Sequence, residues 1–174
     1  MLTARLQLTL PEWLDGVVSD ATAFPDDASR MALAIELARR NVENATGGPF
    51  GAAVFSGDGR LISVGVNRVI AHTCSIAHAE IMAYALAQAR LQRYRLNETG
   101  DKFVLATSAQ PCCQCYGATI WAGIDELLIG ARSELRGRLC DEPGDGREVV
   151  FGKVRKQALH LLPVGFFERE LLFK

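Results

Sequence analysis

The sequence predicts an α/β protein in which helices pack on both faces of a sheet. Short apolar runs of strand length alternate with longer segments whose apolar residues recur at helical spacing. Stretches that contain glycine and proline separate these segments. In the central part of the chain the order is strand, helix, strand, helix, strand. Because crossover connections are right-handed and pack back onto the sheet, we expect helices on both sides of it.

The first long helix is predicted at residues 26–44, after a short amphipathic segment at 11–18. Asp26 and Asp27 suit the positive N-terminal end of this helix, and the Gly-Gly-Pro sequence at 47–49 ends it. The apolar stripe that would face the core consists of Met31, Leu33, Ala34, Ile35, Leu37, Ala38 and Val42.

Two antiparallel strands are predicted at 51–55 and 61–66, because the Ser-Gly-Asp-Gly sequence between them is typical of a hairpin. A helix is predicted at 77–91, which is rich in Ala, Leu, Ile and Met and has no internal Gly or Pro. Further along we expect strands at 103–107 and 126–129, and helices at 112–122, 148–161 and 166–172.

The length and composition are those of a globular protein with a single domain at 1–174. The hydrophobic fraction is 49%, the charged fraction is 22% and the formal net charge is -1. This charge argues against a protein that grips a long stretch of nucleic acid, because such binding needs an excess of Lys and Arg. With no membrane-length apolar run and no export signal in the sequence, we expect a cytoplasmic protein with no membrane partner.

Two short motifs bring metal-ligating side chains to the starts of two predicted helices. The sequence His-Ala-Glu at 78–80 opens one helix, and Pro-Cys-Cys-Gln-Cys at 111–115 opens the next. A strand leads into each motif, so the two loops can converge at one edge of the sheet. His78, Cys112 and Cys115 then give a zinc ion three ligands and leave its fourth tetrahedral position for water, which is the arrangement of a catalytic site.

Glu80 lies two residues from His78, where it can face the water on the zinc rather than the metal itself. Zinc lowers the pKa of bound water to roughly 7, so a nearby carboxylate can take its proton and deliver it to a substrate. This combination of motifs matches the signature of zinc deaminases. We expect one zinc ion per chain with Glu80 as the catalytic residue; the alternatives are a purely structural zinc site or a redox-active cysteine pair.

The chain has five cysteines, and this odd number favours metal chemistry over a disulfide framework. Cys113 stands between two of the predicted ligands, but its position on the helical turn directs it away from them, and we expect it to pack in the core. The remaining histidines and cysteines are expected to be core or incidental residues: His72, His160, Cys74 and Cys140.

From about residue 41 to 132 the sequence resembles the cytidine deaminase-like superfamily, and within it the guanine deaminases. The resemblance implies a three-layer α-β-α sandwich around a central mixed five-stranded sheet, with a zinc core at about 28–132 and a C-terminal helical segment at about 147–174. It also implies a nucleobase substrate and a homodimer. The motifs that carry it are Gly-Gly-Pro-Phe-Gly-Ala at 47–52, Val-Asn at 66–67, Thr-Ser at 107–108 and Gly-Ala-Thr-Ile-Trp-Ala at 117–122.

The resemblance also implies substrate-binding residues. Phe50 would stack near a purine, the amide of Asn67 would pair with its edge, and the backbone N–H of Ala79 would be a fixed donor beside it. Asp141 and Glu142 are the candidates for an acidic residue that reads the base. The alternative roles are core packing for Phe50, a turn amide for Asn67 and a solvated loop for the two acidic residues.

The reaction that the resemblance implies is hydrolytic deamination of guanine to xanthine and ammonia. The sequences at 78–83 and 94–96 are also similar to tRNA adenosine deaminases, but the near-neutral charge favours a free base over an RNA. Cytosine, an s-triazine or a catalytically inactive, zinc-stabilised binding module stay open as alternatives. Gln110 departs from the family, which usually has a glutamate directly before the proline at this motif.

Overall fold

The computed structural model of the protein describes residues 6–16 and 23–131. In this part of the chain, four strands form a mixed sheet in the order β2-β1-β3-β4. β1 (Gly51–Ser56) pairs antiparallel with β2 (Leu61–Val66) and with β3 (Phe103–Ala109), and β3 pairs parallel with β4 (Glu126–Ala131). The mixed sheet is therefore confirmed, while a fifth strand is not among the described residues and stays a prediction.

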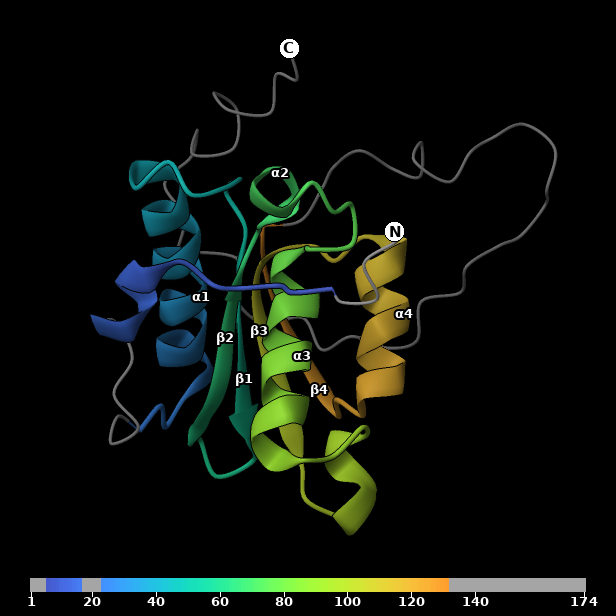
Figure 1. The fold of residues 1–174 in the computed structure, drawn as a ribbon. Helices are drawn as coiled ribbons and strands as arrows, with labels where there is room; N and C mark the ends of the chain where they lie inside the picture. Colours follow the sequence, from blue (N-terminus) through green and yellow to red (C-terminus); the bar gives the residue numbers. More distant parts are fainter. Residues whose placement is uncertain (1–5, 17–22, 132–174) are drawn as a thin grey trace, which may run out of the picture.

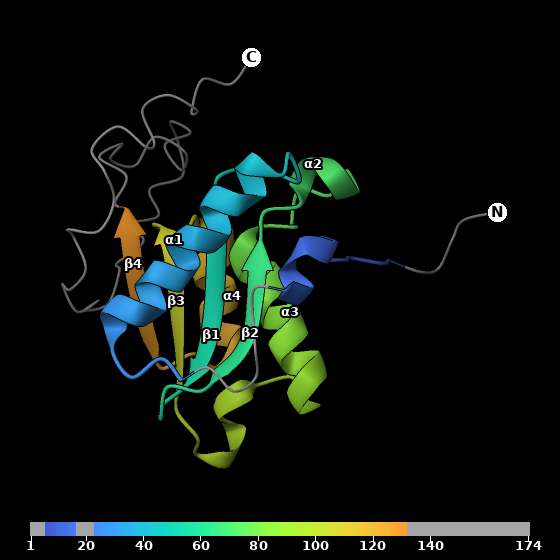
Figure 2. The ribbon, with the colours of Figure 1, turned by 90° about the vertical axis from the view of Figure 1, so that its left-hand side faces the viewer.

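Helices cover both faces of the sheet and complete three layers (Figure 1). α1 (Asp27–Glu43) packs on one face, whereas α3 (Ala79–Leu91) and α4 (Cys113–Ala122) lie on the other. Figure 2 shows the same arrangement from the side, with α1 in front of the strands and the other two helices behind them. The predicted three-layer α-β-α architecture is thus confirmed for the described residues.

Close contact between helices and sheet depends on two glycines. A Cβ atom on Gly51 would lie 2.4 Å from the carbonyl oxygen of Ala34 in α1, and one on Gly65 would lie 2.1 Å from that of Ala79 in α3. Any side chain at these positions would push the helices outward. Gly65 matters for the site, because it lets the first turn of α3 lie directly against β2.

The starts of the helices agree with the sequence predictions to within two residues. Asp26 is the N-cap of α1, where its Oδ1 accepts a hydrogen bond of 2.7 Å from the backbone N–H of Ser29. α3 and α4 begin slightly later than predicted, because His78 and Cys112 have extended backbone conformations and act as N-caps. Two of the three side chains predicted to bind metal therefore stand directly before the helices.

Three short elements were not predicted as helices: η1 (Glu12–Gly16), α2 (Val69–His72) and η2 (Leu96–Thr99). The helices predicted at 148–161 and 166–172 lie outside the described residues, so the extent of the single domain stays a prediction. Within the described part, no helix is both long and apolar enough to cross a membrane.

Candidate active site

The N-terminal ends of α3 and α4 lie at the same end of the sheet (Figure 1). His78, before α3, has φ −72° and ψ 157°, and Cys112, before α4, has φ −69° and ψ 171°. Neither side chain makes a capping hydrogen bond to its own helix. Both side chains can therefore face a common ligand.

The side chains of His78, Cys112 and Cys115, here called the metal group, converge on one point. His78 Nδ1 lies 3.5 Å from Cys112 Sγ and 3.4 Å from Cys115 Sγ, and the three ligand atoms all lie within 4.8 Å of one another. Zn–S bonds of about 2.3 Å and Zn–N bonds of about 2.0 Å at tetrahedral angles separate nitrogen from sulfur by about 3.5 Å. The observed spacing therefore fits one zinc ion bound by Nδ1 and two sulfurs.

The electrostatics of the metal group also call for a cation. The side chain of Cys115 is 0% exposed, and its thiol is free rather than part of a disulfide. Burial raises the pKa of the Cys115 thiol, and the neighbouring Glu80 and Cys112 raise it further. A thiolate at this position needs a compensating positive charge, which a bound zinc ion would supply.

Glu80 lies in the first turn of α3, beside the metal group, and is 7% exposed. Thr107, near the end of β3, has one hydroxyl proton, which is shared between Glu80 Oε1 at 3.4 Å and the carbonyl oxygen of Ala109 at 3.2 Å. The carboxylate does not belong to the group of potential ligands found among the described residues. A carboxylate held in this way, next to the positive end of a helix, can accept a proton and return it.

The predicted base-binding residues Phe50 and Asn67 lie side by side. The backbone N–H of Asn67 donates to the carbonyl oxygen of Phe50 over 3.1 Å. A Cβ atom on Gly48 would lie 3.5 Å from Asn67 Oδ1 and 3.6 Å from Phe50 Cδ2, so the two side chains flank this glycine. Phe50 also packs against the apolar cluster that contains Ala79. Residues 47–50 together with Asn67, the parts of the chain that are predicted to bind a base, are called the base-binding segments below.

Strand register brings these segments to the same end of the sheet as Glu80. Gly51, which follows Phe50, pairs with Val66, which precedes Asn67. The next residue of β1, Ala52, pairs with Thr107, whose hydroxyl contacts Glu80. The metal group, the Glu80 carboxylate and the pair Phe50 and Asn67 therefore lie at the same end of the sheet.

Comparison with known proteins agrees with this geometry. Residues 25–131 match the family described as the cytidine and deoxycytidylate deaminase zinc-binding region. The chain belongs to this family. The matched region contains the whole metal group, Glu80 and the base-binding segments, and the donor set of the metal group fits the zinc ion that the family binds.

Two branches of deaminases are similar to this zinc-binding deaminase. Guanine deaminase from Bacillus subtilis (strain 168) is 40% identical over 131 residues, which are 70% of this chain and 81% of that protein. The structure of guanine deaminase from Nitrosomonas europaea is 41% identical and covers 76% of this chain and 74% of that chain, with a TM-score of 0.71. A tRNA-specific adenosine deaminase from Buchnera aphidicola subsp. Schizaphis graminum (strain Sg) is 36% identical over 105 residues, 60% of this chain and 66% of that protein.

Other residues that the sequence singled out have plainer environments in this deaminase. Cys113 is exposed, so it lies away from the metal group as predicted, but the expectation that it packs in the core is wrong. His72 Nε2 contacts the backbone of Thr9 rather than the metal group. Gln110 is exposed, and its backbone N–H donates to Ala131 over 2.8 Å, which continues the pairing of β3 with β4. Asp141 and Glu142 lie outside the described residues.

Sequence reasoning missed one residue of this end of the molecule, Asn41. Its side chain is 0% exposed and contacts both base-binding segments. The sequence does hold a signal: Asn41 stands three and four residues after Ala38 and Leu37, on the apolar stripe of α1. A polar residue on a buried stripe needs hydrogen-bond partners, and this requirement could have identified it.

Proposed function

We propose that this deaminase converts guanine and water to xanthine and ammonia. The observation that best supports this reaction is that two half-buried residues, Phe50 and Asn67, lie at the end of the sheet where Glu80 and the metal group also lie. An aromatic face and an amide with both donor and acceptor atoms suit a flat, hydrogen-bonding base. The similarity to guanine deaminases also extends over more of the chain than the similarity to the tRNA-specific enzyme.

In this proposal His78, Cys112 and Cys115 would hold one zinc ion, which when bound lets a water molecule act as a nucleophile near neutral pH. Glu80 accepts a proton from the attacking water and delivers it to a ring nitrogen of guanine. A second proton then passes to the exocyclic amine as its bond to C2 breaks. The water oxygen stays on xanthine, and the amine leaves as ammonia.

Recognition of the base is assigned to the neighbouring residues. Phe50 stacks on the ring, and the amide of Asn67 pairs with the edge of the base. Ala79 is the first residue of α3, so its backbone N–H has no acceptor within the helix and can donate to the substrate. Asp141 and Glu142 stay candidates for an acidic contact with the base.

The proposal is tested by ammonia release from a panel of amines at matched concentrations: guanine, cytosine, an amino-s-triazine, adenosine and a tRNA. Guanine should be deaminated with the highest kcat/KM. Faster turnover of adenosine in tRNA would assign the chain to the other branch of its relatives. If zinc removal unfolds the protein while no amine is ever turned over, a zinc-stabilised binding module replaces the enzyme.

We also propose a homodimer that forms through the outer face of α4. Ile120 is 59% exposed and Trp121 is 79% exposed, so neither side chain is buried among the described residues. Burying such an apolar face against a second copy would be favourable. Sedimentation should give twice the chain mass, and Trp121→Glu should give a monomer. A monomeric wild-type protein at micromolar concentration would contradict the proposal.

A cytoplasmic location is the last part of the proposal. The four cysteines in the described residues are all free thiols, as expected in a reducing compartment: Cys74, Cys112, Cys113 and Cys115. Fractionation of cells that express the protein should recover it with the cytoplasmic markers. Recovery with an extracellular or membrane fraction would contradict it.

A further inference from the structure

Asn41 is a polar side chain in the apolar interface between α1 and the sheet. It is 0% exposed, and its neighbours along the same helix, Leu37 and Ala38, are also fully buried. An amide at such a position lowers stability unless its donors and acceptor are all paired.

The hydrogen bonds of Asn41 reach both base-binding segments. Its Nδ2 donates to the carbonyl oxygen of Gly48 over 2.8 Å and to that of Asn67 over 3.0 Å. Its Oδ1 accepts a hydrogen bond of 2.8 Å from Thr46 Oγ1. Because both carbonyls can only accept, the NH2 group must face them. One amide therefore bridges two segments that are far apart in the sequence.

Gly47 allows the two segments to approach each other around this amide. A Cβ atom on Gly47 would lie 1.9 Å from the carbonyl oxygen of Asn67 and 2.7 Å from Asn41 Nδ2. The first distance is a clash with backbone, which cannot move aside as a flexible side chain can. The separation of the two segments is thus set by the absence of a side chain at Gly47 and by the Asn41 hydrogen bonds.

The bridge continues to the N-terminal part of the described chain. Thr46 Oγ1, which donates to Asn41, accepts a hydrogen bond of 3.0 Å from Trp13 Nε1 in η1. Arg68 Nη1, next to Asn67 in sequence, donates to the carbonyl oxygen of Thr46 over 2.5 Å. The loop before β1 is therefore held from three sides.

We infer that Asn41 is a positioning residue that holds Phe50 and Asn67 at the separation required to bind the base. This inference rests on the proposed function, because it takes Phe50 and Asn67 as the base-binding residues. Without the amide, the half-buried carbonyl oxygens of Gly48 and Asn67 each lose a hydrogen bond and the two segments can separate. The effect falls on substrate binding, since the side-chain hydrogen bonds of Asn41 go to Gly48, Asn67 and Thr46 rather than to the metal group or Glu80.

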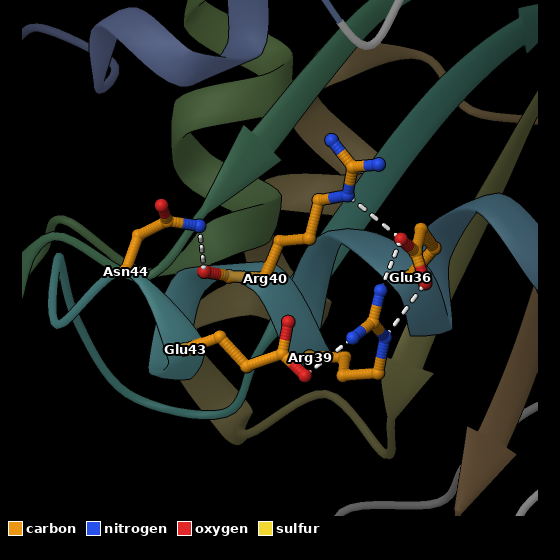
Figure 3. A network of polar contacts seen from close by, with 5 residues as sticks. All are labelled: Glu36, Arg39, Arg40, Glu43 and Asn44. Atoms are coloured by element: carbon orange, nitrogen blue, oxygen red, sulfur yellow. Dashed lines mark hydrogen bonds and ion pairs between the residues drawn. The ribbon is translucent and has the colours of Figure 1, made fainter.

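A matched control, Asn44, stands three residues further along the chain, directly after α1. Asn44 also donates from its amide to a backbone carbonyl, that of Arg40, over 2.8 Å, but it is exposed. Figure 3 shows it at the C-terminal end of the helix, next to the backbone of Arg40, whose side chain pairs with Glu36. Replacing it removes an asparagine from the same helix end without touching the base-binding segments.

The experiment compares Asn41→Ala and Asn44→Ala in the zinc-loaded, full-length protein. Asn41→Ala should raise KM for guanine by about tenfold, as expected when the hydrogen bonds that join the two segments are lost, with a smaller change in kcat and an unchanged zinc content. Asn44→Ala should change KM by less than about twofold. In combination with Asn67→Ala, the loss from Asn41→Ala should shrink, because both act on the same contact.

Amide hydrogen exchange provides a readout that does not depend on the substrate. In Asn41→Ala the N–H of Asn67, which donates to Phe50, should exchange at least about tenfold faster, while Asn44→Ala leaves it unchanged. Thr46→Val is the milder second variant if Asn41→Ala fails to fold, and it should shift KM and exchange in the same direction. If the wild-type enzyme does not deaminate guanine, the proposed function fails, and KM is measured with the amine that it does turn over. A folded Asn41→Ala or Thr46→Val protein with wild-type KM and exchange overturns the inference alone.

Discussion

The metal group and the base-binding segments lie at one end of the sheet but are held in different ways. Every ligand of the metal group stands at or within the first turn of a helix, and Cys112 and Cys115 are three residues apart. The base-binding segments are held across long sequence distances, by the amide of Asn41 and by strand pairing. Local motifs thus build the part that would attack the substrate, and long-range contacts build the part that would recognise it. Substitutions in the two regions should fail in different ways.

The largest effect should come from the metal group itself. Cys115→Ser and His78→Ala should each lose the zinc ion and with it all detectable turnover, because two remaining ligands bind a divalent metal poorly. Zinc per chain is measured by atomic absorption, alongside ammonia release. Cys113→Ser is the matched control: this exposed neighbour should keep both zinc and activity. A Cys115→Ser enzyme with full zinc content would show that the ligand set is wrong.

The next largest effect should separate metal binding from proton transfer. Glu80→Gln keeps the shape of the side chain and should keep the zinc ion, but kcat should fall by about a hundredfold to ten-thousandfold, the usual contribution of a general acid–base residue. Glu43→Gln, on the exposed end of α1, should behave as the wild-type enzyme. Undiminished turnover by Glu80→Gln would exclude this carboxylate as the proton carrier.

A substitution in the base-binding segments should show the opposite pattern. Asn67→Ala should raise KM for guanine by about tenfold to a hundredfold through the lost hydrogen bonds to the base, with zinc content unchanged and kcat less affected. Asn97→Ala removes an amide that donates to Asp125, which contacts Phe103 at the other end of the sheet, and should leave KM unchanged. A loss of zinc in Asn67→Ala would mean that the two regions are not independent.

The same contrast explains what the sequence could predict. The metal group and Glu80 were found because each lies within a few residues of a partner and at a recognisable helix start. Asn41 was not, because its role depends on carbonyl groups of Gly48 and Asn67, which any residue could supply. The exposure of Cys113 was also missed, because periodicity gives a direction on the helix but not what lies in that direction.

The strands show the same limit. Their alternation with helices predicted the layers, and the hairpin sequence at 56–59 predicted the antiparallel pair β1 and β2. The order β2-β1-β3-β4 depends on which edges meet in three dimensions, and short apolar runs do not encode it.

The smallest effect should come from the contact between Tyr84 and Thr119, which joins the two helices that carry the metal group. Thr119 Oγ1 donates to the carbonyl oxygen of Cys115 over 2.8 Å, so the 2.6 Å contact between Tyr84 and Thr119 has the phenol as donor. This contact joins α3 one turn after Glu80 to α4 one turn after Cys115. Tyr84→Phe should therefore lower the free energy of unfolding by about 1 kcal/mol and leave zinc content unchanged.

The buried Tyr84 phenol should also make the stability of the folded protein fall at alkaline pH. Burial raises the pKa of the Tyr84 phenol above its ordinary value, whereas the phenol of the unfolded chain ionises near its ordinary pKa of about 10. Below that pH the contact is fully present; above it the unfolded chain loses a proton that the folded protein keeps, so stability falls. Urea unfolding at rising pH should show a steeper alkaline loss in the wild-type protein than in Tyr84→Phe. Tyr94 is 80% exposed, so Tyr94→Phe should keep the wild-type slope. Equal slopes in all three proteins would mean that the Tyr84 phenol is not buried in solution.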